Sequence, residues 1–258
     1  MSNALRVILA GVRAEARRVY RENTCEKVKE VVNSLMQRPS ERQFQWPLQK
    51  VVLQSHGVRL VPVDNSHLEP LYRWSTEEDI WRYMTFAHLA SREELQTWIN
   101  TAVDANERGT EMNFAIIDEA SQSAIGTTSF YRVVPEHKRL ELGKTWLGAA
   151  YRRTHINTAA KYLMLNHAFE TILANRVELN TDARNLRSQR AMERLGAVRD
   201  GVLRSNIIMR DGFVRDTMNY SFIINEWPTT KVRLRNLLEP TPSAEQSSDP
   251  PSPHVAPE

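Results

Sequence analysis

The sequence predicts one domain of mixed α and β structure (α+β class), in which helices flank a sheet. Segments with alternating apolar and polar residues, typical of strands, interchange with segments whose apolar residues recur at helical spacing. Turn residues such as Asp211 and Gly212 separate consecutive strand-like segments, a pattern typical of hairpins. The 258 residues, 41% of them apolar, can bury one full core, so we expect a single domain with a tail at each end.

Helices lie between the predicted strands in the first half of the domain. Asp64 follows a strand-like segment and is placed to cap the next helix. Ser91, with Glu94 three residues later, has the pattern of a capping box. The elements expected here are a strand at 58–63, helices at 64–74, 77–84 and 91–107, and strands at 112–118, 124–134 and 139–147.

A long helix occupies the middle of the second half. It follows a basic loop after the strand at 139–147, and its apolar residues recur at helical spacing. Gly196 is placed to end a shorter helix, and Pro228 lies in the first turn of the last one, where proline is tolerated. The elements expected after the long helix are a strand at 176–181, a helix at 186–195, strands at 198–209 and 214–224, and a helix at 226–238.

The two ends of the chain differ from this domain, which we expect to span residues 51–239. Residues 1–50 carry apolar side chains at helical spacing and several arginines, and we interpret them as an amphipathic helical extension. A mitochondrial targeting helix is the alternative, although such helices are poor in acidic residues and this segment is not. Residues 240–258 hold six of the twelve prolines and several serines, which predicts a disordered tail.

The bulk composition excludes several classes of protein. Cys25 is the only cysteine, which excludes internal disulfides and thiolate zinc clusters and favours a cytoplasmic protein without a metal. No apolar run approaches the roughly 18 residues that a membrane span needs. The net charge of +3 and the pI near 9.1 are mildly basic, which suits an anionic cofactor and does not demand a nucleic-acid partner.

The stretch from Trp146 to Thr158 joins a strand to the long helix through a loop that contains Arg152 and Arg153. The first turn of a helix leaves backbone N–H groups unpaired, and the peptide dipoles add roughly half a positive charge there. Phosphate binds readily at such a junction, and arginines strengthen the binding through charge-assisted hydrogen bonds. These residues therefore predict an anion site.

The order of elements, with this anion site at its middle, resembles that of the GNAT superfamily of acetyl-CoA-dependent N-acetyltransferases. The resemblance is closer to its RimJ/RimL-type branch, the ribosomal-protein-alanine acetyltransferases, and covers residues 58–238. The residues that carry it are Glu141–Gly143, Arg152, His155, Asn157, Ala168, Phe169, Arg176–Leu179, Asn185, Ser188, Arg194–Ala197 and Asp200–Arg204. It implies a GNAT fold with a mostly antiparallel sheet of about six to seven strands, splayed between the fourth and fifth.

The resemblance implies that acetyl-CoA enters between the splayed strands and places its pyrophosphate on the basic loop. The implied cofactor-binding residues are Trp146, Leu147, Arg152, Arg153, Thr154, His155, Ile156, Asn157, Thr158 and Asn185. His155 and Asn157 depart from the family pattern, which has small residues that let the backbone approach phosphate closely. His155 either gives a ring N–H to a phosphate or turns to solvent, whereas Asn157 tolerates unusual backbone angles.

Glu141 and Ser188 are the expected catalytic residues. Because the family often has a carboxylate on the fourth strand, the resemblance implies Glu141 as the base; the alternative is an ion pair with Arg139 or Lys144. Many GNAT members have a tyrosine acid where this chain has Met192. Ser188 matches a serine of the RimJ/RimL-type pattern, and it either relays a proton to the departing thiolate or caps a helix.

The expected activity is acetyl transfer from acetyl-CoA to a primary amine, either a protein N-terminal α-amine or a small-molecule amine. The alternatives are a catalytically weak GNAT-fold module that binds CoA or regulates, and a basic protein associated with nucleic acid. We expect a monomer or a homodimer. One aromatic group either lines the acceptor side or belongs to the core: Trp74, Trp81, Tyr83, Phe86 and His88.

Overall fold

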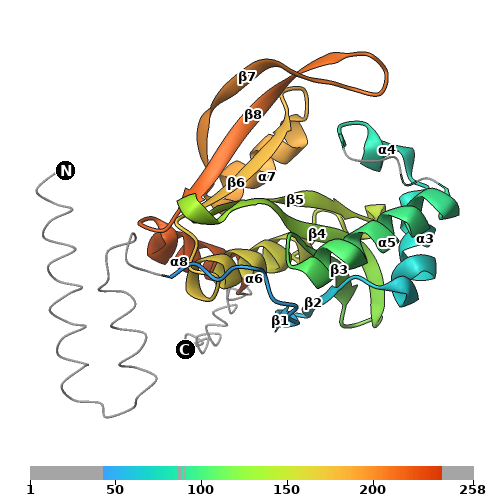
Figure 1. Ribbon diagram of the computed structural model, residues 1–258, viewed down its shortest axis with the longest axis horizontal. Coiled ribbons are helices and arrows are strands. Elements are labelled where there is room, and N and C mark those ends of the chain that lie inside the picture. The colour runs from blue at the N-terminus through green and yellow to red at the C-terminus, as the bar shows by residue number, and fades with distance from the viewer. Residues whose placement is uncertain (1–42, 86–88, 90, 240–258) are drawn as a thin grey trace, which may run out of the picture.

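The computed structural model describes residues 43–85, 89 and 91–239, which fold around one mixed sheet (Figure 1). The strands are β1 (Leu53–Ser55), β2 (Val58–Pro62), β3 (Met112–Asp118), β4 (Ser123–Val134), β5 (Arg139–Leu147), β6 (Arg176–Asp182), β7 (Val198–Ile208) and β8 (Val214–Ile223). The α-helices are α3 (Leu68–Ser75), α4 (Glu78–Trp81), α5 (Arg92–Arg108), α6 (Ile156–Glu170), α7 (Leu186–Leu195) and α8 (Trp227–Leu238). Short 3-10 helices lie at Asn65–His67, Pro135–His137 and Ala149–Tyr151.

These residues form an eight-stranded sheet in the order β1-β2-β3-β4-β5-β6-β8-β7. Neighbouring strands are antiparallel except β5 and β6, which run parallel. Figure 1 shows β7 and β8 as a long hairpin that projects beyond the rest of the sheet. The predicted fold class is confirmed, and the strand that exceeds the expected number is β1, whose three residues are too few to show alternation.

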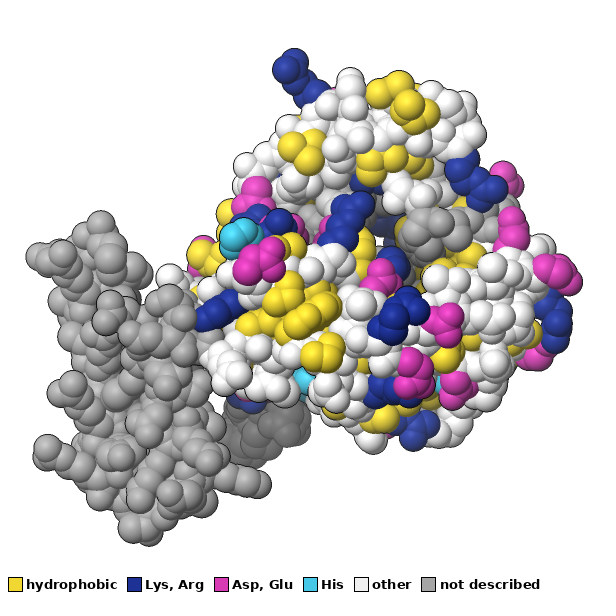
Figure 2. Space-filling view, in the orientation of Figure 1, with side chains coloured by type: hydrophobic (Ala, Val, Ile, Leu, Met, Phe, Trp, Pro, Cys, Tyr) yellow, Lys and Arg dark blue, Asp and Glu magenta, His cyan; other side chains and the backbone are white. Residues whose placement is uncertain are grey.

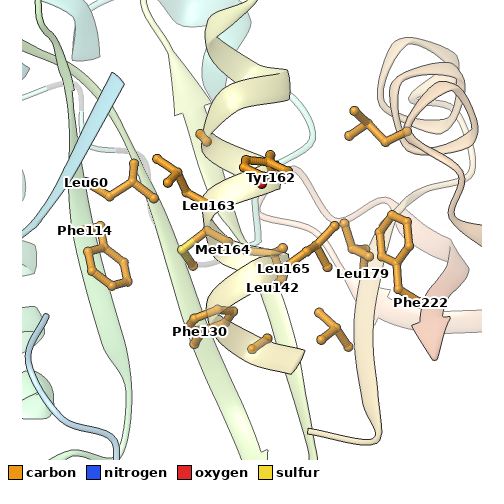
Figure 3. Close-up of a cluster of buried hydrophobic side chains, with 14 of the residues drawn as sticks. Leu60, Phe114, Phe130, Leu142, Tyr162, Leu163, Met164, Leu165, Leu179 and Phe222 are labelled. Atoms are coloured by element: carbon orange, nitrogen blue, oxygen red, sulfur yellow. The ribbon is translucent and has the colours of Figure 1, made fainter. Parts of the chain in front are cut away.

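Apolar side chains form a core on each face of the sheet, because successive residues of a strand point to opposite faces. Ile116 packs in the core that contains α6 and α8, whereas its neighbours Ala115 and Ile117 pack in the core that contains α3, α4 and α5. Figure 3 shows the first of these cores, where α6 lies against strands from both halves of the sheet. The second core includes Trp81 and Trp146.

α6 is buried on most of its surface because it lies between the sheet and α8. Buried residues follow one another from Thr158 to Leu165, so the helix lacks the single apolar stripe of a surface helix. The series includes Lys161, a charged residue that is 6% exposed. The predicted long helix is confirmed, and it supports the sheet from β2 to β8.

β5 and β6 pair over only three residues of each strand, Arg139–Glu141 with Arg176–Glu178. Beyond them, β5 continues beside β4 as far as Leu147, and β6 continues beside β8 as far as Asp182. The two strands no longer pair with each other there, so the sheet opens between them. The splay that the family resemblance implies is therefore present.

Most of the other predicted elements lie where the sequence placed them. Ser91 and Glu94 form the expected capping box of α5, and Gly109 ends that helix with φ +64°. Leu48 is 4% exposed and packs in the larger core, so residues just before the expected domain boundary at 51 pack on the domain. The disordered tail predicted at 240–258 and most of the predicted N-terminal helical extension lie outside the described residues.

Candidate functional site

The cleft between β5 and β6 opens at the carboxyl ends of two parallel strands, where ligands of such sheets commonly bind. The residues that follow β5, from Gly148 to His155, border one side, and those that follow β6, from Ala183 to Asn185, border the other. In the described part of the chain, the edge of β5 from Leu142 to Leu147 has no strand partner on the side of β6. The backbone N–H groups on this edge therefore have no partner on β6 and can meet a ligand.

The loop after β5 is packed against α3. A Cβ atom on Gly148 would lie 2.5 Å from ring atoms of Trp74, so glycine lets the helix approach the loop closely. Trp74 also meets the ring of Tyr151 edge to face, with 5.4 Å between the ring centroids. The expected pyrophosphate loop is thus supported by the helical segment that was expected to line the acceptor side or the core.

Arg152 ties this loop to α4. Its Nε donates to the carbonyl oxygen of Leu147 at 3.0 Å, and its two terminal nitrogens donate to Asp79 and Glu77 at 2.9 Å each. Glu77 also accepts the backbone N–H of Ala149, with both carboxylate oxygens at 3.0 Å. The guanidinium that we expected to face pyrophosphate is therefore paired with two carboxylates in this structure.

The remaining loop residues have separate roles. Arg153 is exposed, with φ +62°, and has no ion pair with a described residue. Thr154 Oγ1 donates to the carbonyl oxygen of Tyr151 at 2.7 Å and accepts the N–H of Ile156 at 3.3 Å. The Nε2 atom of His155 lies 3.1 Å from the carbonyl oxygen of His56, and because a carbonyl only accepts, Nε2 carries the proton. The His155 ring thus braces the loop against the β1–β2 turn.

The first turn of α6 offers open donors. Among the described residues, no acceptor bonds to the backbone N–H of Asn157 or Thr158. The side chains of Ile156 and Thr158 are buried, and Thr158 accepts a hydrogen bond from Arg194 at 2.8 Å, so neither side chain faces a ligand. Open N–H groups at the start of a 15-residue helix can bind an anion such as phosphate.

Glu141 lies at the base of the cleft, as the last residue of β5 that pairs with β6. Its carboxylate is buried and accepts hydrogen bonds from the hydroxyl of Tyr131, the amide of Asn180 and, at 3.1 Å, the guanidinium of Arg132. Burial raises the pKa of Glu141 above its ordinary value, and the bonds from Tyr131 and Arg132 oppose part of this shift. A carboxylate with a raised pKa takes up a proton more readily.

The alternative role of Glu141 was an ion pair with Arg139 or Lys144, but both of these cations pair with other carboxylates. Arg139 pairs with Glu178 at 3.1 Å, and Lys144 pairs with Glu111 at 2.5 Å. Arg132 is the cation at Glu141, and its side chain is 67% exposed whereas that of Glu141 is 5% exposed. A mostly exposed guanidinium stabilises a buried carboxylate less than a buried guanidinium would, so this pair opposes only part of the rise in the pKa of Glu141 that burial causes.

A buried arginine on β8 completes the polar group around Glu141. Arg215 is 2% exposed, and it donates to Thr217 at 3.1 Å and to the oxygen of Asn180 at 3.4 Å. Asn180 therefore accepts from Arg215 and donates to Glu141, which fixes the orientation of its amide. Figure 2 shows Lys and Arg side chains in the hollow between the β7–β8 hairpin and the body of the domain.

Ser188 lies on the other side of the cleft, in the first turn of α7. The side-chain oxygen of Asn185 accepts the backbone N–H of Ser188 at 3.1 Å, so Asn185 is the cap of this helix and Ser188 is not. The Ser188 hydroxyl makes no hydrogen bond within the described residues. Met192 is 9% exposed and packs in the core, so no acid stands at the position where many GNAT members have a tyrosine.

The side chains of Trp146 and Leu147 are buried, so only their backbone groups can face a cofactor. The ring centroids of Trp146 and Trp81 lie 5.7 Å apart, and the Trp146 indole N–H has no acceptor among the described residues. Trp81 therefore belongs to the core, as one of the two interpretations of the aromatic group predicted. Phe86 and His88, two other members of that group, lie outside the described residues.

Sequence reasoning missed the partners of Glu141 and Arg152. Asn180 and Arg215 lie in strands where alternation indicates a sheet but not which polar side chains meet. One signal was available: Arg215 is a charged residue at a position of β8 that alternation places with buried Thr217. Asp79 gave no signal, because an acidic residue in a short surface helix is usually solvated.

Two findings concern metal-binding groups and membrane spans among the described residues. Across residues 43–85, 89 and 91–239, no three or more His, Cys, Asp or Glu side chains are grouped so as to hold a metal ion. None of the helices in these same ranges combines the length and apolar content that a membrane span requires.

The chain is similar to known acetyltransferases. The family described as Acetyltransferase (GNAT) domain matches residues 58–198. Probable N-acetyltransferase YjcK of Bacillus subtilis (strain 168) is 28% identical over 101 residues, which are 39% of this chain and 56% of that protein. The chain thus spans little more than half the length of this curated relative.

Solved structures share the fold. A GCN5-related N-acetyltransferase from Brucella melitensis has 26% sequence identity and a TM-score of 0.71, and the match covers 78% of this chain and 90% of that chain. Ribosomal-protein-S5-alanine acetyltransferase from Vibrio fischeri has 16% identity and a TM-score of 0.60, with 69% of this chain and 98% of that chain covered. The second likeness concerns the fold alone.

Proposed function

We propose that this chain, which belongs to the GNAT acetyltransferase family, transfers an acetyl group from acetyl-CoA to a primary amine. The observation that carries the proposal is the cleft between β5 and β6, which has anion-binding donors at its mouth and a buried carboxylate at its base. Similarity of the chain to Putative ribosomal N-acetyltransferase YdaF of Bacillus subtilis (strain 168), which is 28% identical over 109 residues, supports the RimJ/RimL-type branch.

The loop after β5 and the first turn of α6 would hold the pyrophosphate of acetyl-CoA. The backbone N–H groups of Asn157 and Thr158 are open, and the exposed Arg153 can add a charge-assisted hydrogen bond. His155 is bonded to the β1–β2 turn, so its bulk does not have to crowd the phosphates. When bound, acetyl-CoA supplies a thioester, and an open backbone N–H on β5 near Trp146 or Leu147 would stabilise the negative charge that develops on its carbonyl oxygen.

Glu141 would accept the proton that the amine must lose before it attacks, directly or through a water molecule. Burial raises the pKa of Glu141 toward that of an amine, which makes it a better base at neutral pH. Tyr131 and Asn180 hold the carboxylate in one place by donating to it. These two residues are therefore positioning residues for the base.

The leaving thiolate needs little help, because a thiol has an unperturbed pKa of about 8.5. The hydroxyl of Ser188 is without a partner in the described part of the chain, and Asn185 performs the capping that would otherwise occupy it. These observations support Ser188 as a proton relay to the sulfur. The side-chain NH2 of Asn185 is the group left to bond the amide-bearing arm of the cofactor, since its oxygen caps α7.

We propose a protein N-terminal α-amine as the first acceptor to test, and a small-molecule amine as the second. An α-amine has an ordinary pKa of about 7.7–8.0 and lysine one of about 10.4, so the α-amine needs less help from Glu141 at neutral pH. We further propose a cytoplasmic monomer or homodimer without a nucleic-acid partner. The curated relative is bacterial, which gives the mitochondrial alternative no support.

The test is a thiol-release assay with the full chain, acetyl-CoA, and a panel of N-terminal peptides, lysine peptides and small amines. Thiol release that depends on an α-amine, with mass spectrometry locating the acetyl group on it, would support the proposal. The alternative is a catalytically weak module, which the burial of Met192 at the usual acid position favours. Binding of CoA without turnover on any acceptor would establish that alternative.

A further inference from the structure

The loop after β5 carries donors that are filled by an internal anion. The backbone N–H of Ala149 and one nitrogen of Arg152 both donate to the carboxylate of Glu77. A backbone N–H beside a guanidinium is the arrangement with which proteins bind oxyanions, including phosphate. The loop after β5 therefore has the donors of an anion site, and the carboxylate of Glu77 occupies them.

Asp79 extends this arrangement across the mouth of the cleft. Its Oδ2 atom accepts Arg152 at 2.9 Å and Arg187 at 3.1 Å. Arg152 belongs to the loop after β5, and Arg187 to the first turn of α7 after β6, so the two cations come from opposite sides of the cleft. The hydrogen bond from Arg187, more than any other contact, lowers the pKa of Asp79, so this carboxylate is charged at neutral pH.

We propose that Arg152 and Arg187 form a binding site for a phosphate group of the donor, and that the carboxylate of Asp79 competes with the phosphate for these two cations. The inference rests on the proposed function in one respect, namely that the donor is a CoA thioester. A phosphate group presents oxygens to the same two guanidinium groups and carries more negative charge than a carboxylate. Binding of the donor therefore exchanges one anion for another at this site.

The exchange does not require α4 to move. Ile80 and Trp81 are buried at 6% and 5% exposure, and they anchor the helix in the smaller core. The side chain of Asp79 is 57% exposed, so it can rotate into water when its partners are taken. Arg187 is 55% exposed and can follow an incoming phosphate.

The deciding variant is Asp79→Asn, with CoA binding to the full chain measured by titration calorimetry. Removal of the competing carboxylate should lower the Kd for CoA by about two- to five-fold, the range expected for exposed ion pairs. Binding of pantetheine, which has no phosphate, should not change. Glu69→Gln is the matched control, because it removes one negative charge and one exposed ion pair, with Arg92, from the neighbouring helix.

Arg187→Gln removes one of the two proposed phosphate ligands, so it should raise the Kd for CoA and leave the binding of pantetheine unchanged. A Kd for CoA that rises in Asp79→Asn, or stays equal to that of the parent, would overturn the inference. An equal gain with pantetheine would overturn it too, since the effect would then not depend on phosphate. Failure of the parent chain to bind CoA at all would instead refute the proposed function.

Discussion

Replacement of Lys161 by Met tests whether this lysine is buried without a counter-ion between α6 and the sheet. The Nζ atom of Lys161 donates to the hydroxyl of Thr145 at 2.7 Å and lies 3.5 Å from that of Thr128, and no carboxylate contacts it in the described part of the chain. Burial without a counter-ion disfavours the ammonium form and lowers the pKa of Lys161 from 10.5 to about 7. As the pH rises above about 7, the folded protein therefore loses a proton that the unfolded chain still keeps.

This shift has a definite sign and size. Below the pKa of Lys161 in the folded protein, the lysine is protonated in both the folded and the unfolded state. The buried charge then destabilises the fold by at most about 4–5 kcal/mol, because each unit between the two pKa values corresponds to about 1.36 kcal/mol. Between pH 7 and pH 10.5 the unfolded state binds more protons, so this penalty shrinks as the pH rises. Lys161→Met removes the titrating group, and its advantage over the parent should fall by up to about 3 kcal/mol between pH 7 and pH 9.5.

The assay is urea unfolding of parent and variant at several values between pH 7 and pH 9.5, followed by circular dichroism. Met matches the length of the lysine stem, and Thr128 and Thr145 keep each other as hydrogen-bond partners at 2.9 Å. Lys50→Met removes an exposed lysine and controls for the change in net charge. Unfolding free energies of parent and Lys161→Met that run parallel across this pH range would refute the reasoning.

Three further predictions concern the site. Glu141→Gln should lower kcat by about 10²–10⁴-fold at neutral pH. It should also abolish the fall in rate that the parent shows at acidic pH, because that fall comes from protonation of Glu141, whose pKa is raised. An unchanged pH–rate profile would contradict the role of Glu141 as base. Gly148→Ala should raise the KM for acetyl-CoA and cost about 1–3 kcal/mol in thermal unfolding, because the new Cβ meets Trp74 at 2.5 Å. Adding Trp74→Ala should recover part of that loss, and no recovery would point to another cause. Ser188→Ala should lower kcat and leave Tm unchanged because Asn185 caps the helix; a lower Tm would indicate a structural role.

Local signals allowed much of the fold to be predicted from the sequence. The capping box of Ser91 and Glu94 and the left-handed Gly109 are determined by neighbouring residues, so α5 could be placed from the sequence. β1 could not, because its three residues become a strand only by pairing with β2. A segment of that length carries no periodic signal of its own.

The candidate site was predictable only in part, because its geometry depends on contacts between distant strands and helices. Glu141 could be singled out through its place on the fourth strand, yet its bond to Asn180 spans 39 positions of the sequence. The contact between Arg152 and Glu77 spans 75 positions. A charge pattern along the chain does not reveal such pairs, because many acids and bases could satisfy an arginine equally well.

The narrow junction between β5 and β6 has a consequence for turnover. Three residue pairs connect these strands, so widening the cleft breaks few backbone hydrogen bonds compared with separating any other pair of long strands described here. Product release and the first step of local unfolding would then both begin with the separation of β5 from β6. Substitutions that strengthen this junction should raise thermal tolerance and slow the release of CoA together.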